Sequence, residues 1–347
     1  MALLKPYTIA ELSFELRTEI GHEGKNSKAF IAYDNQLDTE IVIKKILKAP
    51  LDVSRFFDEA KTLYLSSHPN VAPIHYACQD RDFIYLAMPY YTQGSLKQLM
   101  KQRYLTVREI VKFGCNIGSG LHNIHSKGLI HFDVKPDNVL LSERSEGLLA
   151  DFGLCRPISY SGVAEPDQVY SKMVPPEAFV KTAHGVTFDI YQMGMTLYRM
   201  CNGDQEFYRQ LDAFKKDLNL DLHLFKHAVV NGQFPDRTIF PEHIPLRLRK
   251  LIKSCIEPDI ANRPIAVINV TNELAQVDDR LDWQYTASDD TRGWACTREN
   301  GMEYHLVVNF DGSSLARKGR NGKFSKITSH TKTAIKTSEI KDFLSAL

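Results

Sequence analysis

Apolar residues follow two different periods along the chain, and the first is that of strands. Within residues 14–88, the segments 29–32 and 40–43 are rich in strand formers and are separated by turn residues at 34–35. One helix interrupts these strands, because apolar residues recur at helical spacing over residues 56–64. The pattern therefore predicts a small, mostly β lobe with one main helix.

Helical spacing dominates after Met88. The segments with apolar residues three and four apart are 96–100, 107–124, 190–200 and 246–256. A small strand-rich lobe (about 12–88) followed by a large helical lobe (about 92–278) predicts an α+β fold with two lobes, which together form one domain over residues 12–278.

The pattern changes again near residue 280. Residues 294–298 and 304–310 are typical of strands, and Asn300-Gly301 between them is a strong signal for a two-residue hairpin turn. We therefore predict a small β-meander domain over residues 281–347, which we call the tail.

A short closing helix is expected at the end of the tail. Ser338 is its predicted N-cap, because serine is among the residues that cap helices best. Ile340, Phe343, Leu344 and Leu347 would share one face of this helix, as helical spacing requires.

Length and composition fit an ordinary globular protein of 347 residues, long enough for two domains. The formal net charge of +1 excludes a protein that binds nucleic acid with its whole surface, so any polyanion site must be local. No apolar run reaches the length of a membrane span, and residues 1–20 lack the apolar stretch of a signal peptide. The six cysteines are scattered without a Cys-x-x-Cys pair, which predicts free thiols and a cytoplasmic protein.

The densest candidate chemistry lies in residues 130–141, which read Ile-His-Phe-Asp-Val-Lys-Pro-Asp-Asn-Val-Leu-Leu. A carboxylate, an ammonium and an amide stand here at fixed offsets, as Asp133, Lys135 and Asn138. Phosphoryl transfer needs all three: a base that orients a hydroxyl, a cation that meets the moving phosphoryl group, and an oxygen ligand for Mg²⁺. Ten residues after this loop, Asp151 opens an Asp-Phe-Gly motif and adds a second carboxylate suited to a metal.

These motifs closely resemble those of the eukaryotic-type serine/threonine protein kinases. The resemblance implies the two-lobed kinase fold, with ATP as the phosphoryl donor and Mg²⁺ as the metal. It implies Asp133 as the base, Lys135 as the cation at the γ-phosphate, and Asn138 and Asp151 as the metal ligands. The position of Lys135 matches the Ser/Thr-specific rather than the Tyr-specific subgroup.

In the strand-rich lobe, the resemblance implies a loop over the nucleotide phosphates. Gly21 and Gly24 lie in this loop, and Ser27 stands about where the third family glycine belongs. Glycine lets backbone N–H groups approach phosphates closely. The spacing is one residue longer than the family pattern, so the loop is identified mainly by its position between two predicted strands.

The resemblance also implies a phosphate-binding lysine. Lys44 ends an apolar strand and matches the family lysine that bridges the α- and β-phosphates, with Glu59 of the predicted helix as its ion-pair partner. Lys45 is the alternative, but its side chain should face the opposite side of the strand.

The adenine site is implied by residues 85–91, which resemble the family hinge. Met88 would be the gatekeeper, while the Pro89 carbonyl and the Tyr91 N–H would bond the adenine edge. Proline is tolerable at position 89 because only its carbonyl is needed.

Phe132 departs from the family pattern, in which most members carry an arginine that pairs with a phosphate on the activation loop. Phenylalanine cannot form that pair, so we predict that activity does not require activation-loop phosphorylation. The loop hydroxyls that could be autophosphorylated are Ser159, Tyr160, Ser161, Tyr170 and Ser171.

Three further matches have structural roles in the family. Glu177 and Arg263 are expected to form a buried ion pair in the lower lobe. Asp189 is expected to anchor the backbone of the catalytic loop from the start of a helix.

The tail is basic over residues 312–338, which contain no acidic residue. Its cationic side chains are those of Arg317, Lys318, Arg320, Lys323, Lys326, Lys332 and Lys336. They indicate either a site for an acidic partner or nucleic acid, or simply a solvated face of the meander. Phe310 and Phe324 flank them and are expected to belong to the core.

The sequence therefore predicts an ATP- and Mg²⁺-dependent serine/threonine protein kinase, with autophosphorylation, acting on protein hydroxyls. Two alternatives remain. The chain could be a pseudokinase-type nucleotide-binding scaffold, or a binding module that acts through its basic tail under control of the kinase lobes. The enzyme is favoured because all five side chains expected of an active kinase are present. They are Lys44, Glu59, Asp133, Asn138 and Asp151.

Overall fold

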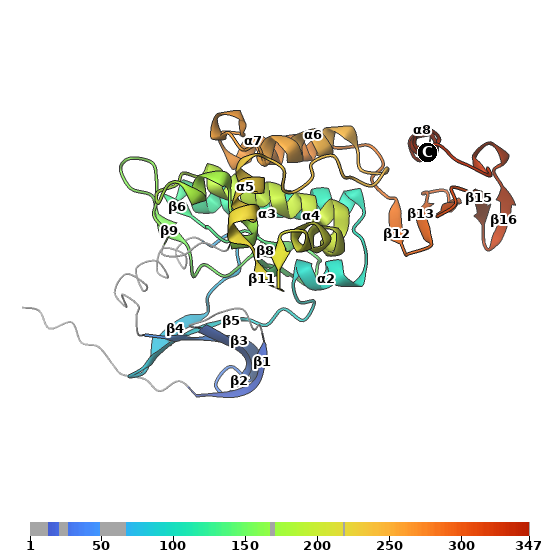
Figure 1. Cartoon of the computed structure of the whole chain (residues 1–347). Coiled ribbons are helices and arrows are strands. Elements are labelled where there is room, and N and C mark those ends of the chain that lie inside the picture. Colours follow the sequence, from blue (N-terminus) through green and yellow to red (C-terminus); the bar gives the residue numbers. More distant parts are fainter. Residues whose placement is uncertain (1–12, 21–26, 49–66, 167–170, 218, 347) are drawn as a thin grey trace, which may run out of the picture. The chain divides into compact units, whose positions relative to one another are not determined.

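The computed structural model describes residues 13–20, 27–48, 67–166, 171–217 and 219–346 (Figure 1). They belong to two compact units, Met1–Thr92 and Gln93–Leu347. The first unit contains a β-sheet, and the second contains helices followed by another β-sheet, which confirms the predicted α+β class. The helix predicted over residues 56–64 lies outside the described residues.

The first unit is built on a five-stranded antiparallel sheet in the order β1-β2-β3-β5-β4. Its strands are β1 (Phe14–Ile20), β2 (Ser27–Asp34), β3 (Thr39–Leu47), β4 (Tyr76–Gln79) and β5 (Phe83–Pro89). One face buries an apolar cluster of Ala32, Ile41, Ile43 and Ala87. Because side chains alternate between faces, Val42 and Lys44 lie on the other face of β3.

The second unit begins with six helices that carry most of its core. They are α2 (Leu96–Gln102), α3 (Val107–Ser126), α4 (Thr187–Asp212), α5 (Leu222–Val230), α6 (Leu246–Cys255) and α7 (Val267–Ala275). Helix α3 shows why the sequence folds this way: Thr106 and Glu109 form a capping box at its start, and Ile110, Ile117 and Leu121 are fully buried on one face.

Short strands lie between these helices in the chain and form two-stranded sheets with one another. The pairs are β6 (Leu129–Ile130) with β9 (Arg156–Pro157), β7 (Val139–Leu141) with β8 (Gly147–Leu149), and β10 (Lys215–Lys216) with β11 (Asn219–Leu220). The first two pairs enclose the loop that carries the candidate chemistry. No helix in the described part of the chain is long and apolar enough to cross a membrane.

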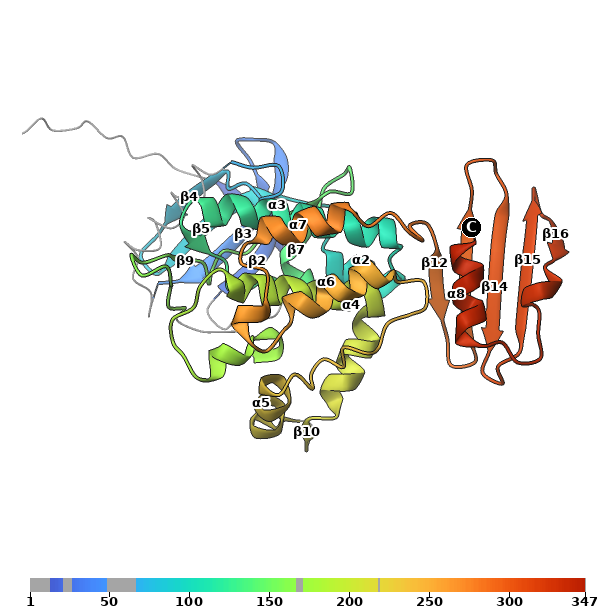
Figure 2. The ribbon, with the colours of Figure 1, turned by 90° about the horizontal axis from the view of Figure 1, so that it is seen from above.

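The tail forms a second five-stranded antiparallel sheet whose strands pair in chain order. The strands are β12 (Gln284–Ala287), β13 (Thr291–Thr297), β14 (Glu303–Asn309), β15 (Ser314–Arg320) and β16 (Lys323–Lys326). Helix α8 (Thr337–Ser345) lies against one face of this sheet (Figure 2).

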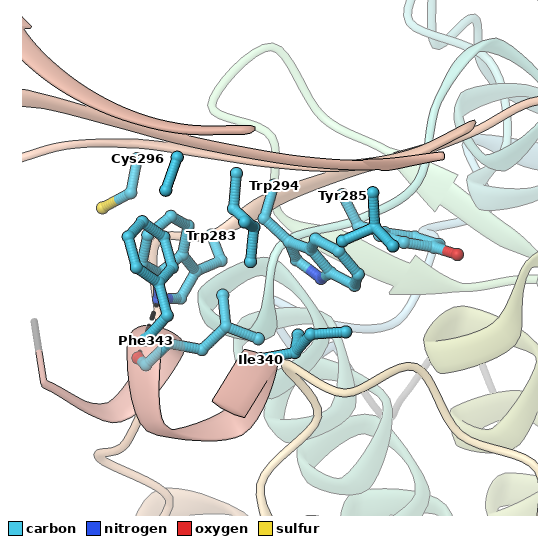
Figure 3. Packing of buried hydrophobic residues seen from close by; sticks show 10 residues of the cluster. Trp283, Tyr285, Trp294, Cys296, Ile340 and Phe343 are labelled. Atoms are coloured by element: carbon cyan, nitrogen blue, oxygen red, sulfur yellow. Dashed lines mark hydrogen bonds between the residues drawn. The ribbon is translucent and has the colours of Figure 1, made fainter. Parts of the chain in front are cut away.

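The tail core lies between α8 and the sheet (Figure 3). Trp283 and Trp294 are almost fully buried there against Ile340 and Phe343, and the Trp283 indole N–H donates to the Leu344 carbonyl at 3.0 Å. Burial of such large rings is the main stabilising contribution that a sheet and one helix can make.

The start of α8 differs from the prediction. Its N-cap is Lys336, not Ser338, because the Glu339 carboxylate accepts the Lys336 N–H at 2.9 Å and the helix begins at Thr337. The predicted apolar face is confirmed for Ile340, Phe343 and Leu344, and Leu347 lies outside the described residues. The expectation that Phe310 and Phe324 belong to the core was wrong, because they are 91% and 41% exposed.

The tail sheet packs against the helical part of the second unit through an aromatic contact centred on His243. The His243 ring stacks on Tyr285 with 5.2 Å between centroids, and the Trp294 indole N–H donates to His243 Nδ1 at 3.3 Å. Tyr104 meets Tyr285 edge to face at 4.8 Å. The ion pair of Arg292 with Glu242 (2.6 Å) lies beside these rings.

Burial keeps His243 neutral. Burial first, and then the charges of Arg249 and Arg280, lower the pKa of His243 from 6.5 to about 3. A histidine that is neutral in the fold but protonated when exposed destabilises the folded state as pH falls below its ordinary pKa. The packing of the tail is therefore sensitive to acid.

We predict that the free energy of unfolding decreases as pH falls from 6.5 toward 3 partly through His243. In His243→Phe, which keeps an apolar ring at this position, the decrease should be smaller. Urea unfolding at several pH values measures this. His223→Phe, at an exposed histidine on α5, is the control and should follow the wild type. If the free energy of unfolding fell equally with pH in wild type and in His243→Phe, the prediction would be contradicted.

Candidate active site

Asp189 in the first turn of α4 holds the backbone of the catalytic loop. Its carboxylate is completely buried and accepts the N–H groups of His131 and Phe132, each at 2.8 Å. It also lies 2.8 Å from His125 Nε2. The two hydrogen bonds to backbone N–H groups confirm the anchoring role expected for Asp189.

The same contacts keep the Asp189 carboxylate ionised. Burial by itself would raise the pKa of Asp189, but the hydrogen bond and charge of His125 and the interactions with His131 outweigh it and lower the pKa below the ordinary value. A buried carboxylate that accepts several N–H groups is stable in its charged form. Asp189 thus fixes the loop as an anion.

Phe132 adopts a left-handed backbone conformation, with φ of 65°. This conformation is strained for a bulky residue other than glycine. Two side chains of α4 hold it: Asp189 accepts the Phe132 N–H, and Gln192 donates from Nε2 to the Phe132 carbonyl at 3.0 Å. Gln192 Oε1 also accepts the Val134 N–H at 2.9 Å, so the chain is fixed on both sides of Asp133.

Asp133, Lys135 and Asn138 converge within this loop. Asn138 Nδ2 donates to Asp133 Oδ2 at 2.7 Å and to the Asp133 carbonyl at 2.9 Å. Lys135 Nζ lies 3.1 Å from the same Oδ2. In the part of the chain that the structure describes, the other carboxylate oxygen of Asp133, Oδ1, has no hydrogen-bond partner.

His131 links the catalytic loop to the segment that carries Asp151. Its Nδ1 accepts the Asp133 N–H at 3.2 Å, and its Nε2 lies 3.2 Å from the Ala150 carbonyl. Burial lowers the pKa of His131, which keeps the ring neutral with its proton on Nε2. Its ring also contacts Phe152 edge to face at 5.0 Å.

The donor set beside this loop fits a hard cation such as Mg²⁺. Both amide hydrogen bonds of Asn138 come from Nδ2, so its Oδ1 has no partner among the described residues. The Ala150 N–H donates to the Asn138 carbonyl at 2.9 Å, and the exposed Asp151 is the next residue in the chain. Amide and carboxylate oxygens are the ligands that Mg²⁺ prefers.

Phe132 is the centre of an apolar cluster that we call the Phe132 cluster. It contains the fully buried Ile130, Phe132 and Phe188 together with Ala164, and Leu154, Ile158, Ala178 and Val186 pack against it. The Phe132 and Phe188 rings meet edge to face at 5.0 Å. The activation segment runs from Asp151 to Glu177. The cluster therefore joins the catalytic loop to this segment and to the start of α4 by apolar contacts.

Glu177 and Arg263 form the expected buried ion pair. The pair is bidentate, with N–O distances of 2.7 and 2.8 Å, and the Arg263 guanidinium lies 4.8 Å from the centre of the Tyr191 ring. Arg263 also donates to the carbonyls of Glu257, Pro258 and Thr187. All its donors are thus used, as a buried guanidinium requires.

In the first unit, Lys44 and Met88 lie on the same face of the sheet. Lys44 is opposite Leu86 on β5, and Val42 is opposite Met88. Lys45 faces the other way, where its ammonium lies 3.9 Å from the centre of the Phe83 ring. The predicted difference in direction between the two lysines is confirmed.

The hinge residues follow β5. Pro89 is the last residue of that strand, and the Tyr91 N–H has no partner in the described residues. Burial raises the pKa of the Tyr91 phenol, so it stays neutral. Ser27 is the first residue of β2.

Three predicted site residues, Gly21, Gly24 and Glu59, lie outside the described residues. Of the other predicted site residues, the first unit contains Ser27, Lys44, Met88, Pro89 and Tyr91, and the second unit contains Asp133, Lys135, Asn138 and Asp151.

Two positioning residues escaped the sequence prediction, Gln192 and His131. Gln192 stands three residues after Asp189, so helical spacing places both on the same side of α4, facing the loop. That spacing was the available signal. The bridge that His131 makes between Asp133 and Ala150 becomes visible only in three dimensions.

Comparison with known proteins agrees with this geometry. A family model described as protein kinase domain matches residues 14–273, so the tail sheet lies outside the match. The chain is 25% identical over 318 residues to serine/threonine-protein kinase PknD of Protochlamydia amoebophila, with 80% of this chain and 31% of the relative covered.

Further relatives come from distant organisms. The chain is 27% identical to the probable serine/threonine-protein kinase CPE1738 of Clostridium perfringens, with 76% of this chain and 38% of the relative covered. It is 29% identical to serine/threonine-protein kinase MRCK gamma of Mus musculus, with 57% and 13% covered. The chain thus spans less than half the length of these relatives.

We predict that Asp189→Asn lowers the free energy of unfolding by about 2–4 kcal/mol, because an amide presents only one acceptor and sets its NH₂ against a backbone N–H. Chemical denaturation measures this. Asp212→Asn at the exposed end of the same helix is the control and should change stability by about 0.5 kcal/mol or less. Equal effects of the two substitutions would contradict the assigned role of Asp189.

Proposed function

This chain belongs to the protein kinase family, and we propose that it transfers the γ-phosphoryl group of ATP to serine and threonine hydroxyls of proteins. The observation that carries the proposal is the arrangement of Asp133. One carboxylate oxygen, Oδ2, is held by Asn138 and Lys135, which leaves Oδ1 for a substrate hydroxyl. The left-handed turn at Phe132 orients this oxygen.

In this mechanism Asp133 Oδ1 accepts the proton of the substrate hydroxyl as the hydroxyl oxygen bonds to the γ-phosphorus and ADP leaves. Lys135 stays beside Asp133 and balances the negative charge that develops on the transferred group. Both side chains are about nine-tenths buried, which strengthens these interactions by excluding water.

For the nucleotide, we assign the phosphates to Gly21, Gly24, Ser27 and Lys44, with Glu59 as the partner of Lys44. The Pro89 carbonyl and the Tyr91 N–H would bond the adenine edge, with Met88 as the gatekeeper. The proposal is supported by the Tyr91 N–H, which has no partner among the described residues.

Mg²⁺ would be held by Asn138 Oδ1 and Asp151, and it would neutralise charge on the phosphates. The two ligands and Asp133 lie within residues 133–151, and Asp189 anchors the backbone just before this stretch.

Serine/threonine specificity is supported by Lys135 and by the names of the relatives, which are serine/threonine kinases. Autophosphorylation is part of the same proposal, and Tyr160 and the neighbouring Ser159 and Ser161 are exposed in the activation segment. Tyr170 and the Ser171 side chain lie outside the described residues. The free cysteines support a cytoplasmic location.

Phosphorylation of the activation segment is not needed in this proposal. The Phe132 cluster already packs that segment against the catalytic loop, at the position where an arginine would otherwise need a phosphate.

An acidic protein partner of the tail is a second proposal. The basic side chains of the hairpin divide between two faces: Arg317 and Lys326 on one, and Lys318, Arg320 and Lys323 on the other. They do not form one continuous track along a strand of nucleic acid, which favours a compact acidic group over nucleic acid.

We predict that Asp133→Asn lowers phosphorylation of a protein substrate by about 10²–10⁴-fold, because it removes the base and keeps the shape of the side chain. Incubation with labelled ATP and Mg²⁺, followed by phosphoamino-acid analysis, measures this, and the label should be on serine and threonine. Glu143→Gln, an exposed carboxylate after β7, is the control and should be as active as wild type. Equal incorporation by wild type and Asp133→Asn would refute the enzyme, whereas ATP binding without transfer would favour the scaffold.

We predict that phosphatase-treated protein keeps its initial rate of substrate phosphorylation, which is measured before and after the treatment. Loss of activity that returns on phosphorylation of Ser171 or Tyr170 would overturn the idea.

We also predict that Phe132→Ala destabilises the Phe132 cluster by about 3–5 kcal/mol. Limited proteolysis of the activation segment measures this loss as faster cleavage. Val180→Ala, at an exposed apolar residue just after that segment, is the control.

A further inference from the structure

The β15–β16 hairpin of the tail places cationic side chains opposite one another. Asn321 and Gly322 both have positive φ, 52° and 78°, which is the two-residue turn that joins antiparallel strands most tightly. This turn sets the register that pairs Arg320 with Lys323 and Lys318 with Ser325. These four residues therefore share one face of the hairpin.

The hairpin forms one wall of an open hollow of about 370 Å³. The residues on this face of the hairpin that line it are Lys318, Arg320, Lys323 and Ser325, and Met302 of the neighbouring strand pair lines it as well. No carboxylate lines this hollow, and the three cations make no ion pair with any carboxylate that the structure describes. The hollow thus has three positive charges and one hydroxyl.

Two glycines allow this close arrangement. A Cβ at Gly319 would lie 2.2 Å from the Lys323 carbonyl oxygen and 2.7 Å from Phe324 Cδ1, so only glycine lets β16 approach here. A Cβ at Gly301 would lie 3.3 Å from Arg320 Nε, which shows that the guanidinium rests on the β13–β14 turn. Arg320 is therefore positioned by a second strand pair.

The arrangement is unfavourable without an anion. Like charges directly opposite on neighbouring strands repel one another, and here Arg320 faces Lys323 with Lys318 beside them. By contrast, Lys332 of the same basic region is paired with Glu339. Unfavourable contacts between like charges are expected at functional sites, where a ligand supplies the opposite charge.

We propose that this hollow binds the phosphoryl group of a phosphoserine or phosphothreonine in a phosphorylated substrate protein. A phosphoryl group carries about two negative charges and three acceptor oxygens, which matches three cations and a hydroxyl in one place. Met302 supplies an apolar contact for the peptide that carries it. The choice of a phosphorylated protein rests on the proposed kinase activity, whose products carry this group.

The test is fluorescence polarisation with a short labelled peptide that carries one phosphothreonine and no other charged side chain. The protein is the full chain, treated with phosphatase that is then removed, and no ATP is added. The phosphopeptide should bind, and the unphosphorylated peptide should bind at least about tenfold more weakly, because charge-assisted hydrogen bonds are lost.

A matched pair of double variants locates the site. Arg320→Gln with Lys323→Gln should weaken phosphopeptide binding by at least about tenfold. Arg317→Gln with Lys326→Gln removes one arginine and one lysine paired across the same two strands but on the opposite face, and should leave binding close to wild type. Circular dichroism confirms that both variants are folded.

Several results would overturn the proposal: no binding of the phosphopeptide, equal binding of both peptides, or equal losses in the two double variants. Tighter binding of a single-stranded oligonucleotide, with a steep dependence on salt, would assign the surface to nucleic acid instead. Because no ATP is present, failure of this experiment leaves the proposed transfer reaction intact, and an inactive enzyme that still binds phosphopeptide would refute only the transfer.

Discussion

The site depends on one buried anion, the carboxylate of Asp189. It accepts the N–H groups of two consecutive residues, His131 and Phe132, and this geometry forces the chain to turn just before Asp133. A turn with a positive φ at phenylalanine is costly, so it persists only because Asp189 and Gln192 over-determine it. The position of the catalytic carboxylate is therefore a consequence of helix α4, on which the loop rests.

Replacing arginine by phenylalanine at position 132 changes how the activation segment is held. An arginine there would be a buried charge that needs a phosphate, whereas Phe132 contributes apolar contacts that exist as soon as the chain folds. In the proposed function, the cluster replaces a phosphorylation-dependent contact with a permanent one. Control of activity would then act elsewhere, and the proposed phosphate-binding hollow on the tail would be one place where product and enzyme communicate.

Local sequence predicted those features that depend on neighbours in the chain. A hairpin between β13 and β14, the apolar face of α8 and the opposite directions of Lys44 and Lys45 follow from turn chemistry and side-chain periodicity. The two-residue turn predicted at Asn300-Gly301 was wrong: Thr297 pairs with Glu303 and the Arg298 N–H donates to the Met302 carbonyl, so the loop has three residues, 299–301, of which only Gly301 has a positive φ. The predicted start of α8 at Ser338 was wrong, because the Glu339 carboxylate accepts the Lys336 N–H and makes Lys336 the N-cap.

Features that depend on partners distant in sequence could not be predicted. The stacking of His243 on Tyr285 and the bridge from His131 to Ala150 join segments that the linear pattern does not relate. The division of the basic tail into two faces required the register of β15 with β16. The roles assigned to Lys44, Asp133, Asn138 and Asp151 stay proposals that these positions support.

The most direct measurement of the central claim is hydrogen exchange of the His131 and Phe132 backbone amides by NMR in phosphatase-treated protein. If Asp189 and the Phe132 cluster hold the loop by themselves, both amides should be strongly protected, and equally so before and after the phosphates are removed. Fast exchange of these amides in the unphosphorylated protein, slowed only by phosphorylation of the activation segment, would contradict the account.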